Sequence, residues 1–96
     1  MARLEAAEAR ETYLVEHYEP GLDVDELRRW AAHLRDTVAA LECEGKPIRY
    51  LRSTIVPRDE SFLCVLEAAS DELVREAYTR AGISFERIST AISEEG

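Results

Sequence analysis

Two apolar runs joined by a charged turn form the strongest pattern along this chain. The runs cover 48–56 and 62–68, and both are rich in the β-branched and aromatic residues that strands favour. Pro57 begins the turn between them, and proline cannot donate a hydrogen bond to a strand ladder. The pattern therefore predicts a β-hairpin within residues 48–69.

Two further strands are predicted near the ends of the chain, at 12–18 and 85–92. Along TYLVEHY, side chains alternate between the two faces of a strand. His17 therefore shares one face with Tyr13 and Val15, whereas its neighbour Glu16 points to the opposite face.

Two amphipathic helices are predicted between the strands. Asp23 is followed by Glu26, which gives a capping-box pair at the start of the first helix, and Gly45 is a good stop signal. Ser70 is the predicted cap of the second helix, and Gly82 is its predicted end. The first helix carries one apolar stripe, formed by Val24, Leu27, Trp30, Ala31, Leu34, Val38 and Leu41.

The resulting order of elements is β-α-β-β-α-β, the split βαβ arrangement of a ferredoxin-like α+β fold. We expect a four-stranded antiparallel sheet with two helices on one face. Residues 1–10 lack an apolar face and are predicted to form a mobile arm, so that 11–96 make up a single domain. The second sheet face carries apolar side chains without a covering helix, which predicts a homodimer packed sheet to sheet, as in a dimeric α/β barrel.

A polar group on the second predicted strand is the main candidate for a ligand pocket. Strict alternation places Tyr50, Arg52 and Thr54 on one face, which we expect to be buried in the dimer. A buried arginine needs a partner, and Glu16 and Glu67 are the candidates. An ion pair that is only structural and a pocket for a small ligand are both open readings of this group.

The register of the hairpin decides which carboxylate can reach Arg52. A two- or four-residue loop places Tyr50 opposite Glu67, whereas a three-residue loop places Cys64 and Leu66 on the Tyr50 face. The turn sequence PRDE does not choose between these loops.

The two histidines are the candidate nitrogen ligands for a metal. His17, at a strand end beside a turn, is a candidate ligand for nickel, copper, zinc or iron, although a lone histidine without the dense His/Cys spacing of a closed metal site is more often structural or exposed. His33 lies off the apolar stripe and is predicted to be a solvated surface residue. Cys64 is predicted to be a small buried side chain, and Cys43 follows a helix end whose dipole disfavours a thiolate.

The composition restricts partners and compartment. A net charge of −8 disfavours nucleic acid and anionic membranes as partners. The N-terminal segment has no apolar region typical of a signal peptide, and no apolar run is long enough for a membrane span. The two cysteines make no disulfide framework. A cytoplasmic protein is therefore expected. Nucleotide-binding and hydrolase motifs are also missing, so no catalytic residue is assigned.

Three segments together resemble a known family: YLVEHYEPG, RYLRSTIVPRDESFLCVLEA and VREAYTRAGISFERI. They are similar to a family of small bacterial ferredoxin-like proteins, first catalogued as a domain of unknown function, that includes a nickel-binding protein. The resemblance covers about 13–92 and implies a homodimer and Ni(II) as a candidate ligand. Because the chain has only two histidines, bound Ni(II) would need mixed ligands, such as His17 with carboxylates or waters.

Three functions follow from these observations. The first is a small cytoplasmic protein that binds a metal, with Ni(II) as the candidate. The second is a dimeric α/β barrel that binds a small molecule, or a cofactor-free monooxygenase-like enzyme, using the polar group around Arg52. The third is an interaction module without a ligand of its own.

Overall fold

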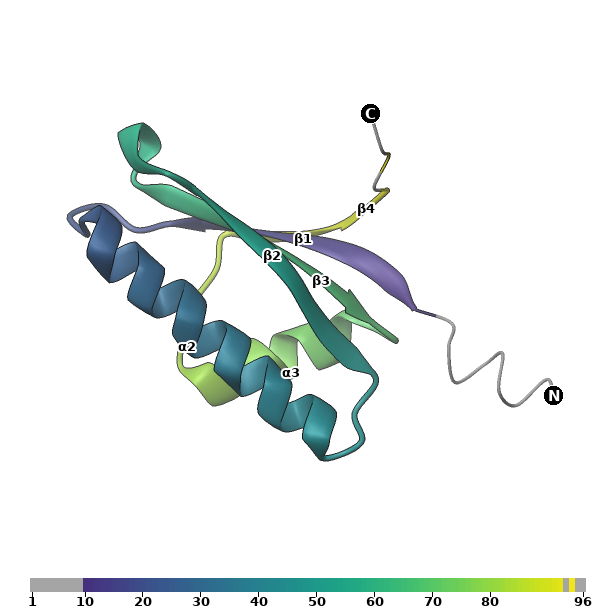
Figure 1. The fold of residues 1–96 in the computed structure, drawn as a ribbon. Helices are drawn as coiled ribbons and strands as arrows, with labels where there is room; N and C mark the ends of the chain where they lie inside the picture. Colours follow the sequence, from purple (N-terminus) through teal and green to yellow (C-terminus); the bar gives the residue numbers. More distant parts are fainter. Residues whose placement is uncertain (1–9, 93, 95–96) are drawn as a thin grey trace, which may run out of the picture.

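A computed structural model of the chain describes residues 10–92 and residue 94. Its elements are β1 (Glu11–Tyr18), α2 (Val24–Cys43), β2 (Ile48–Val56), the short 3₁₀ turn η1 (Pro57–Asp59), β3 (Ser61–Ala68), α3 (Asp71–Ala81) and β4 (Arg87–Ala91). The strands form one antiparallel sheet in the order β2-β3-β1-β4, and both helices cover the same face of it (Figure 1). The predicted α+β class and βαββαβ order are confirmed, whereas nearly all of the predicted arm lies outside the described residues.

The helices begin and end where their capping chemistry predicts. The Asp23 carboxylate accepts from the Glu26 backbone N–H at 2.8 Å, and the Glu26 carboxylate accepts from the Asp23 N–H at 2.9 Å. This reciprocal pair satisfies two donors at the start of α2. Ser70 caps α3 through its side-chain oxygen, which accepts from the Leu73 backbone N–H at 3.3 Å. Gly82 ends α3 with a φ of 72°, a conformation that glycine adopts without a Cβ penalty.

The core lies between the helices and the sheet. On α2, the predicted stripe contributes the buried Leu27, Leu34, Val38 and Leu41, with Trp30 packed against the edge of the core. The sheet contributes a matching set from three strands: Tyr13, Val15, Ile48, Phe62, Cys64, Leu66 and Ala68. The faces of β1 and β3 therefore follow the predicted alternation.

The hairpin contains a β-bulge that changes the face of one predicted site residue. Near the turn, Val56 pairs with Ser61 across a four-residue loop, and Arg52 pairs with Val65. The register then shifts by one residue, because Leu51 has no partner in the ladder and Tyr50 pairs with Leu66. The expectation of strict alternation along β2 is thus wrong. The extra residue of the bulge puts Tyr50 and Arg52 on opposite faces of the sheet, although they are two positions apart.

The sheet face away from the helices is called the open face here. Among its residues are Leu14, Glu16, Arg52, Thr54, Leu63, Val65 and Glu67. Leu14 pairs with Val65, and Leu63 lies beside them on β3, so these three side chains form one apolar strip. No helix among the described residues covers this strip (Figure 1).

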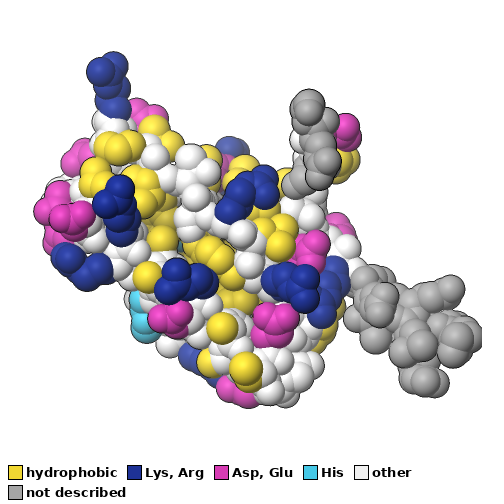
Figure 2. All heavy atoms as spheres, viewed as in Figure 1, with side chains coloured by type: hydrophobic (Ala, Val, Ile, Leu, Met, Phe, Trp, Pro, Cys, Tyr) yellow, Lys and Arg dark blue, Asp and Glu magenta, His cyan; other side chains and the backbone are white. Residues whose placement is uncertain are grey.

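Charges of both signs are interspersed over the side of the molecule seen in Figure 2, with apolar atoms exposed between them. Such mixed charge is typical of a soluble surface rather than of a single-sign binding patch. Within residues 10–92, neither helix is both long and apolar enough to cross a membrane.

Candidate functional site

Four of the five predicted pocket residues lie on the open face, spread over three strands. Arg52 and Thr54 come from β2, Glu16 from β1 and Glu67 from β3. Tyr50 is not among them, because the bulge at Leu51 turns its side chain to the helix-covered face. The predicted trio on β2 is therefore divided between the two sides of the sheet.

The carboxylates of this face differ in their ion pairing. Arg87 on β4 donates from Nε and Nη2 to one oxygen of Glu16, both at 2.8 Å, so Arg87 and not Arg52 holds Glu16. Neither Arg52 nor Glu67 has an ion-pair partner among the described residues. The partner of Arg52 foreseen in the sequence is thus missing within this part of one chain.

Tyr50 instead belongs to a polar cluster inside the protein. Its hydroxyl contacts Ser53 Oγ and lies 3.4 Å from Cys64 Sγ. Burial raises the pKa of Tyr50 above 10 and also raises the pKa of the Cys64 thiol, so both groups stay protonated at neutral pH. The expectation that Cys64 is a small buried side chain is confirmed.

His17 lies in the same interior layer and is 1% exposed. Its ring stacks on Phe62 at 3.9 Å between centroids and on Tyr78 at 5.2 Å. Nδ1 lies 3.0 Å from the Phe62 carbonyl oxygen, which can only accept, so Nδ1 carries the proton and Nε2 has a free lone pair. Burial lowers the pKa of His17 to about 4, and the imidazole is neutral at physiological pH.

Two interior polar atoms have no hydrogen-bond partner within the described residues: His17 Nε2 and the Tyr78 hydroxyl. A buried polar atom without a partner is costly, so each one marks a position of interest. A histidine whose Nδ1 is anchored by a carbonyl and whose Nε2 is free has the orientation that metal ligands adopt.

Comparison with known proteins places the chain in a family. A family model described as "Nickel responsive protein SCO4226-like" matches residues 13–90. The chain belongs to this family. The resemblance noted in the sequence is thereby confirmed. A search of curated proteins gives no match.

A solved structure supports the fold of this SCO4226-like protein. The crystal structure of SCO4226 from Streptomyces coelicolor A3(2) matches with a TM-score of 0.68 and 19% sequence identity. The match covers 88% of this chain and 99% of that chain. At this level of identity, the match shows a shared fold.

The family name raises the question of whether this chain can hold nickel, and the described residues of one chain do not form a complete metal site. His17 is a suitable nitrogen donor, but no group of three His, Cys, Asp or Glu side chains comes together within residues 10–92 and 94. Glu16, its neighbour in sequence, points to the opposite face of the sheet. Metal binding through His17 stays a prediction, and it would require further donors.

His33 is exposed, as predicted for a surface residue, and it also makes a structural contact. Its Nε2 lies 3.0 Å from the carbonyl oxygen of Ala81 at the end of α3. It also lines a cleft with Trp30 and Ile83, which the sequence did not reveal as a site. These residues are about fifty positions apart, and no local pattern signals their contact.

Proposed function

We propose that this SCO4226-like chain is a small nickel-responsive protein that acts as a homodimer. The open face lies between the two copies, and Ni(II) is held at that surface with Glu67 as a ligand. The family match over residues 13–90 is the observation that carries the nickel part of the proposal. The dimer part rests on the apolar strip, which no described helix covers and in which Leu14 and Leu63 are partly exposed while Val65 is 9% exposed.

The open face has the features expected of an interface between identical chains. Leu14, Leu63 and Val65 form an apolar centre on β1 and β3, and charged side chains surround it. Interfaces commonly combine an apolar centre with a polar rim. A twofold axis would place the same patch on both sides of the interface. The apolar strip of one copy would then pack against the apolar strip of the other.

The position of Glu67 supports its role as a ligand shared between the copies. It lies on β3 between Thr12 on β1 and Arg49 on β2, and Arg49 already contacts Glu42 at 3.6 Å. A carboxylate that occurs once in each copy occurs twice at a twofold interface. Oxygen ligands and waters, with or without an imidazole, are within the range of donors that divalent nickel accepts.

The experiment compares Ni(II) affinity and oligomeric state across matched variants. Ni(II) affinity is measured by competition with a chelator, and mass by sedimentation. Glu67→Gln is expected to weaken Ni(II) binding at least about tenfold, because charged ligands supply much of the affinity for a divalent ion. Glu72→Gln, an equal charge change at an exposed position on α3, should leave affinity unchanged.

The dimer is tested separately with Leu63→Glu, which places a charge in the centre of the apolar strip. This variant is expected to sediment as a folded monomer, since an unpaired charge in an interface is costly. Ala39→Glu on the exposed side of α2 is the control and should remain dimeric. A Glu67→Gln protein with full Ni(II) affinity, together with a His17→Gln protein without it, would move the ligand to His17 and overturn the assignment of Glu67.

A second candidate function is a small-molecule site between the two sheets, as in dimeric α/β barrels that include cofactor-free monooxygenases. The observation in its favour is that Arg52 lies beside Thr54 on the open face without an ion-pair partner in the described chain. A dimer that binds a small carboxylate in solution, and loses it on Arg52→Gln, would support this function. A dimer whose Arg52→Gln variant binds the same compounds unchanged would argue against it.

A further inference from the structure

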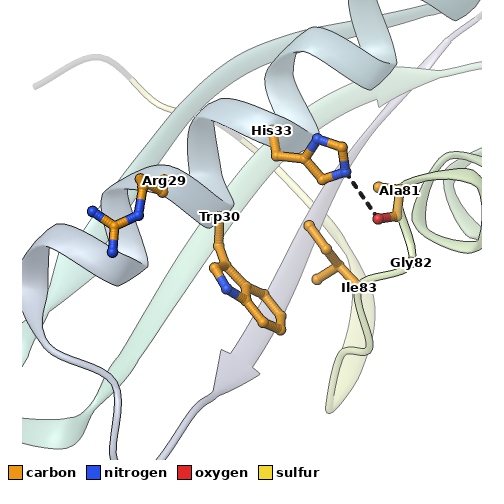
Figure 3. Close-up of a pocket in the computed structure, with 6 residues that line it drawn as sticks. All are labelled: Arg29, Trp30, His33, Ala81, Gly82 and Ile83. Carbon is orange, nitrogen blue, oxygen red and sulfur yellow. Dashed lines mark hydrogen bonds between the residues drawn. The ribbon is translucent and has the colours of Figure 1, made fainter.

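A cleft of about 310 Å³ lies between α2 and the turn that follows α3, away from the open face. Figure 3 shows its lining, which consists of Arg29, Trp30, His33, Ala81, Gly82 and Ile83. Its volume is at the small end of the range for ligand pockets. The cleft is therefore large enough for a small organic molecule.

The base of the cleft is apolar and firmly placed. Trp30 packs against the core from α2, and Ile83 is itself a buried core residue. The hydrogen bond from His33 Nε2 to the Ala81 carbonyl, drawn as a dashed line in Figure 3, ties α2 to the end of α3. A flat indole held by a packed core is a suitable surface for a planar ligand.

The backbone of the cleft offers few groups to a ligand. The N–H groups of Gly82 and Ile83 both donate to the carbonyl of Tyr78, at 2.9 and 3.1 Å. The Ala81 carbonyl accepts from His33. Polar groups of a ligand must therefore find their hydrogen-bond partners among the side chains of the cleft.

The available side-chain groups are mainly donors. Arg29 has no ion-pair partner, and the Trp30 indole N–H has no hydrogen-bond acceptor, among the described residues. The lining contains one cation and no carboxylate, although the chain has 20 acidic residues and a net charge of −8. The acids one turn before Arg29 are engaged elsewhere, since Asp25 lies 3.8 Å from Arg28 and Glu26 takes part in the capping box.

We propose that this cleft binds a small planar organic anion of the aromatic carboxylate class. The ring of the ligand lies on the Trp30 indole and against Ile83. Figure 3 shows the exposed Arg29 side chain turned away from the indole, so its guanidinium must rotate toward the cleft to donate to the ligand carboxylate. Arginine matches a carboxylate with two parallel donors, which gives both charge and orientation. This site is separate from the surface assigned to the dimer and to nickel.

The chain supplies its own reporter for this site, because Trp30 is its only tryptophan. The test records the indole N–H resonance of the full chain by NMR during titration with benzoate. Benzamide has the same shape without the charge and serves as the matched probe. Saturable shifts of the Trp30 indole and of the Gly82 and Ile83 amides are expected with benzoate, with an affinity for benzamide about three- to fivefold lower.

Two arginines that are adjacent in sequence provide the matched variants. Arg29→Gln is expected to reduce benzoate affinity to that of benzamide, whereas Arg28→Gln, with the same loss of charge outside the lining, should leave it within about twofold. Ala81→Leu, at a partly exposed position, fills the cleft and should abolish binding of both probes.

The proposal is overturned if benzoate causes no saturable shift at Trp30 in the folded protein. It is equally overturned if Arg28→Gln and Arg29→Gln weaken binding by the same factor, since that result would mean a general charge effect rather than a contact. Benzoate binding that survives Ala81→Leu would also contradict it.

Discussion

Replacing His17 with phenylalanine should remove a pH-dependent contribution to the stability of this protein. Phenylalanine keeps an aromatic ring between Phe62 and Tyr78, where His17 is stacked, but it cannot bind a proton. It also cannot donate to the Phe62 carbonyl, as Nδ1 does at 3.0 Å. At neutral pH, the lost hydrogen bond is expected to cost about 1–2 kcal/mol of unfolding free energy.

The sign of the pH effect follows from the direction of the pKa shift. Burial lowers the pKa of His17 to about 4 in the folded chain, whereas an unfolded histidine has a pKa of about 6.5. As the pH falls, the unfolded chain therefore binds the proton first, and the folded state loses stability between about pH 6.5 and pH 4. The full shift corresponds to about 3 kcal/mol, of which about 2 kcal/mol is already lost at about pH 5.

The assay is urea unfolding of both proteins at about pH 7.5 and pH 5, with the unfolding free energy compared at each pH. The parent protein should lose about 2 kcal/mol more than His17→Phe on this change, because carboxylates contribute equally to both proteins. His33→Gln is the control, because it removes the other histidine of the chain, which is exposed. Equal loss in His17→Phe and the parent would refute a neutral, buried His17.

Two further predictions concern the helix cap and the cysteines. Asp23→Ala should lower the unfolding free energy by about 1 kcal/mol in urea titrations, since it removes the capping box of α2, whereas Asp25→Ala should cost clearly less. Unchanged stability in Asp23→Ala would contradict the capping assignment. In thiol labelling of the native protein, the exposed Cys43 should react and the buried Cys64 should stay protected until the chain unfolds. Two thiols reacting equally fast in the folded protein would show that the interior around Cys64 is open.

The parts of the fold that depend on local chemistry could be predicted from the sequence. Asp23, Ser70 and Gly82 act through groups only a few residues away, and each one caps or ends its helix as predicted. The apolar stripe of α2 could likewise be predicted, because the helical spacing of its apolar residues is visible within that one segment of the sequence. These local signals agree with one another, which is why the βαββαβ order of elements could be predicted from the sequence.

The bulge in β2 could not be predicted, because nothing in the sequence marks Leu51 as an extra residue. Its presence depends on how β2 fits β3 over the whole ladder, and it moves Tyr50 away from Arg52. The hairpin loop has four residues, a length that was expected to place Tyr50 opposite Glu67. Because of the bulge, Glu67 instead lies opposite Arg49. Register is a property of two strands together, and one strand pattern does not contain it.

The burial of His17 could not be predicted from the neighbouring sequence either. Alternation correctly placed it on the face of Tyr13 and Val15, but a position near a strand end gave no sign of burial. Burial comes from Phe62 on β3 and Tyr78 on α3, which lie 45 and 61 positions further along the chain. The contact of His33 with Ala81 has the same origin, since it joins two helices only in the folded chain.

The central claim, a nickel-responsive homodimer, is tested most directly by native mass spectrometry of tag-free protein before and after addition of Ni(II). We predict a dimer that retains Ni(II) at a fixed ratio after desalting and releases it to a chelator. Co(II) and Zn(II) treated in the same way show whether retention is selective. A monomer, or a dimer that retains no Ni(II) under conditions where the protein is folded, would contradict the claim.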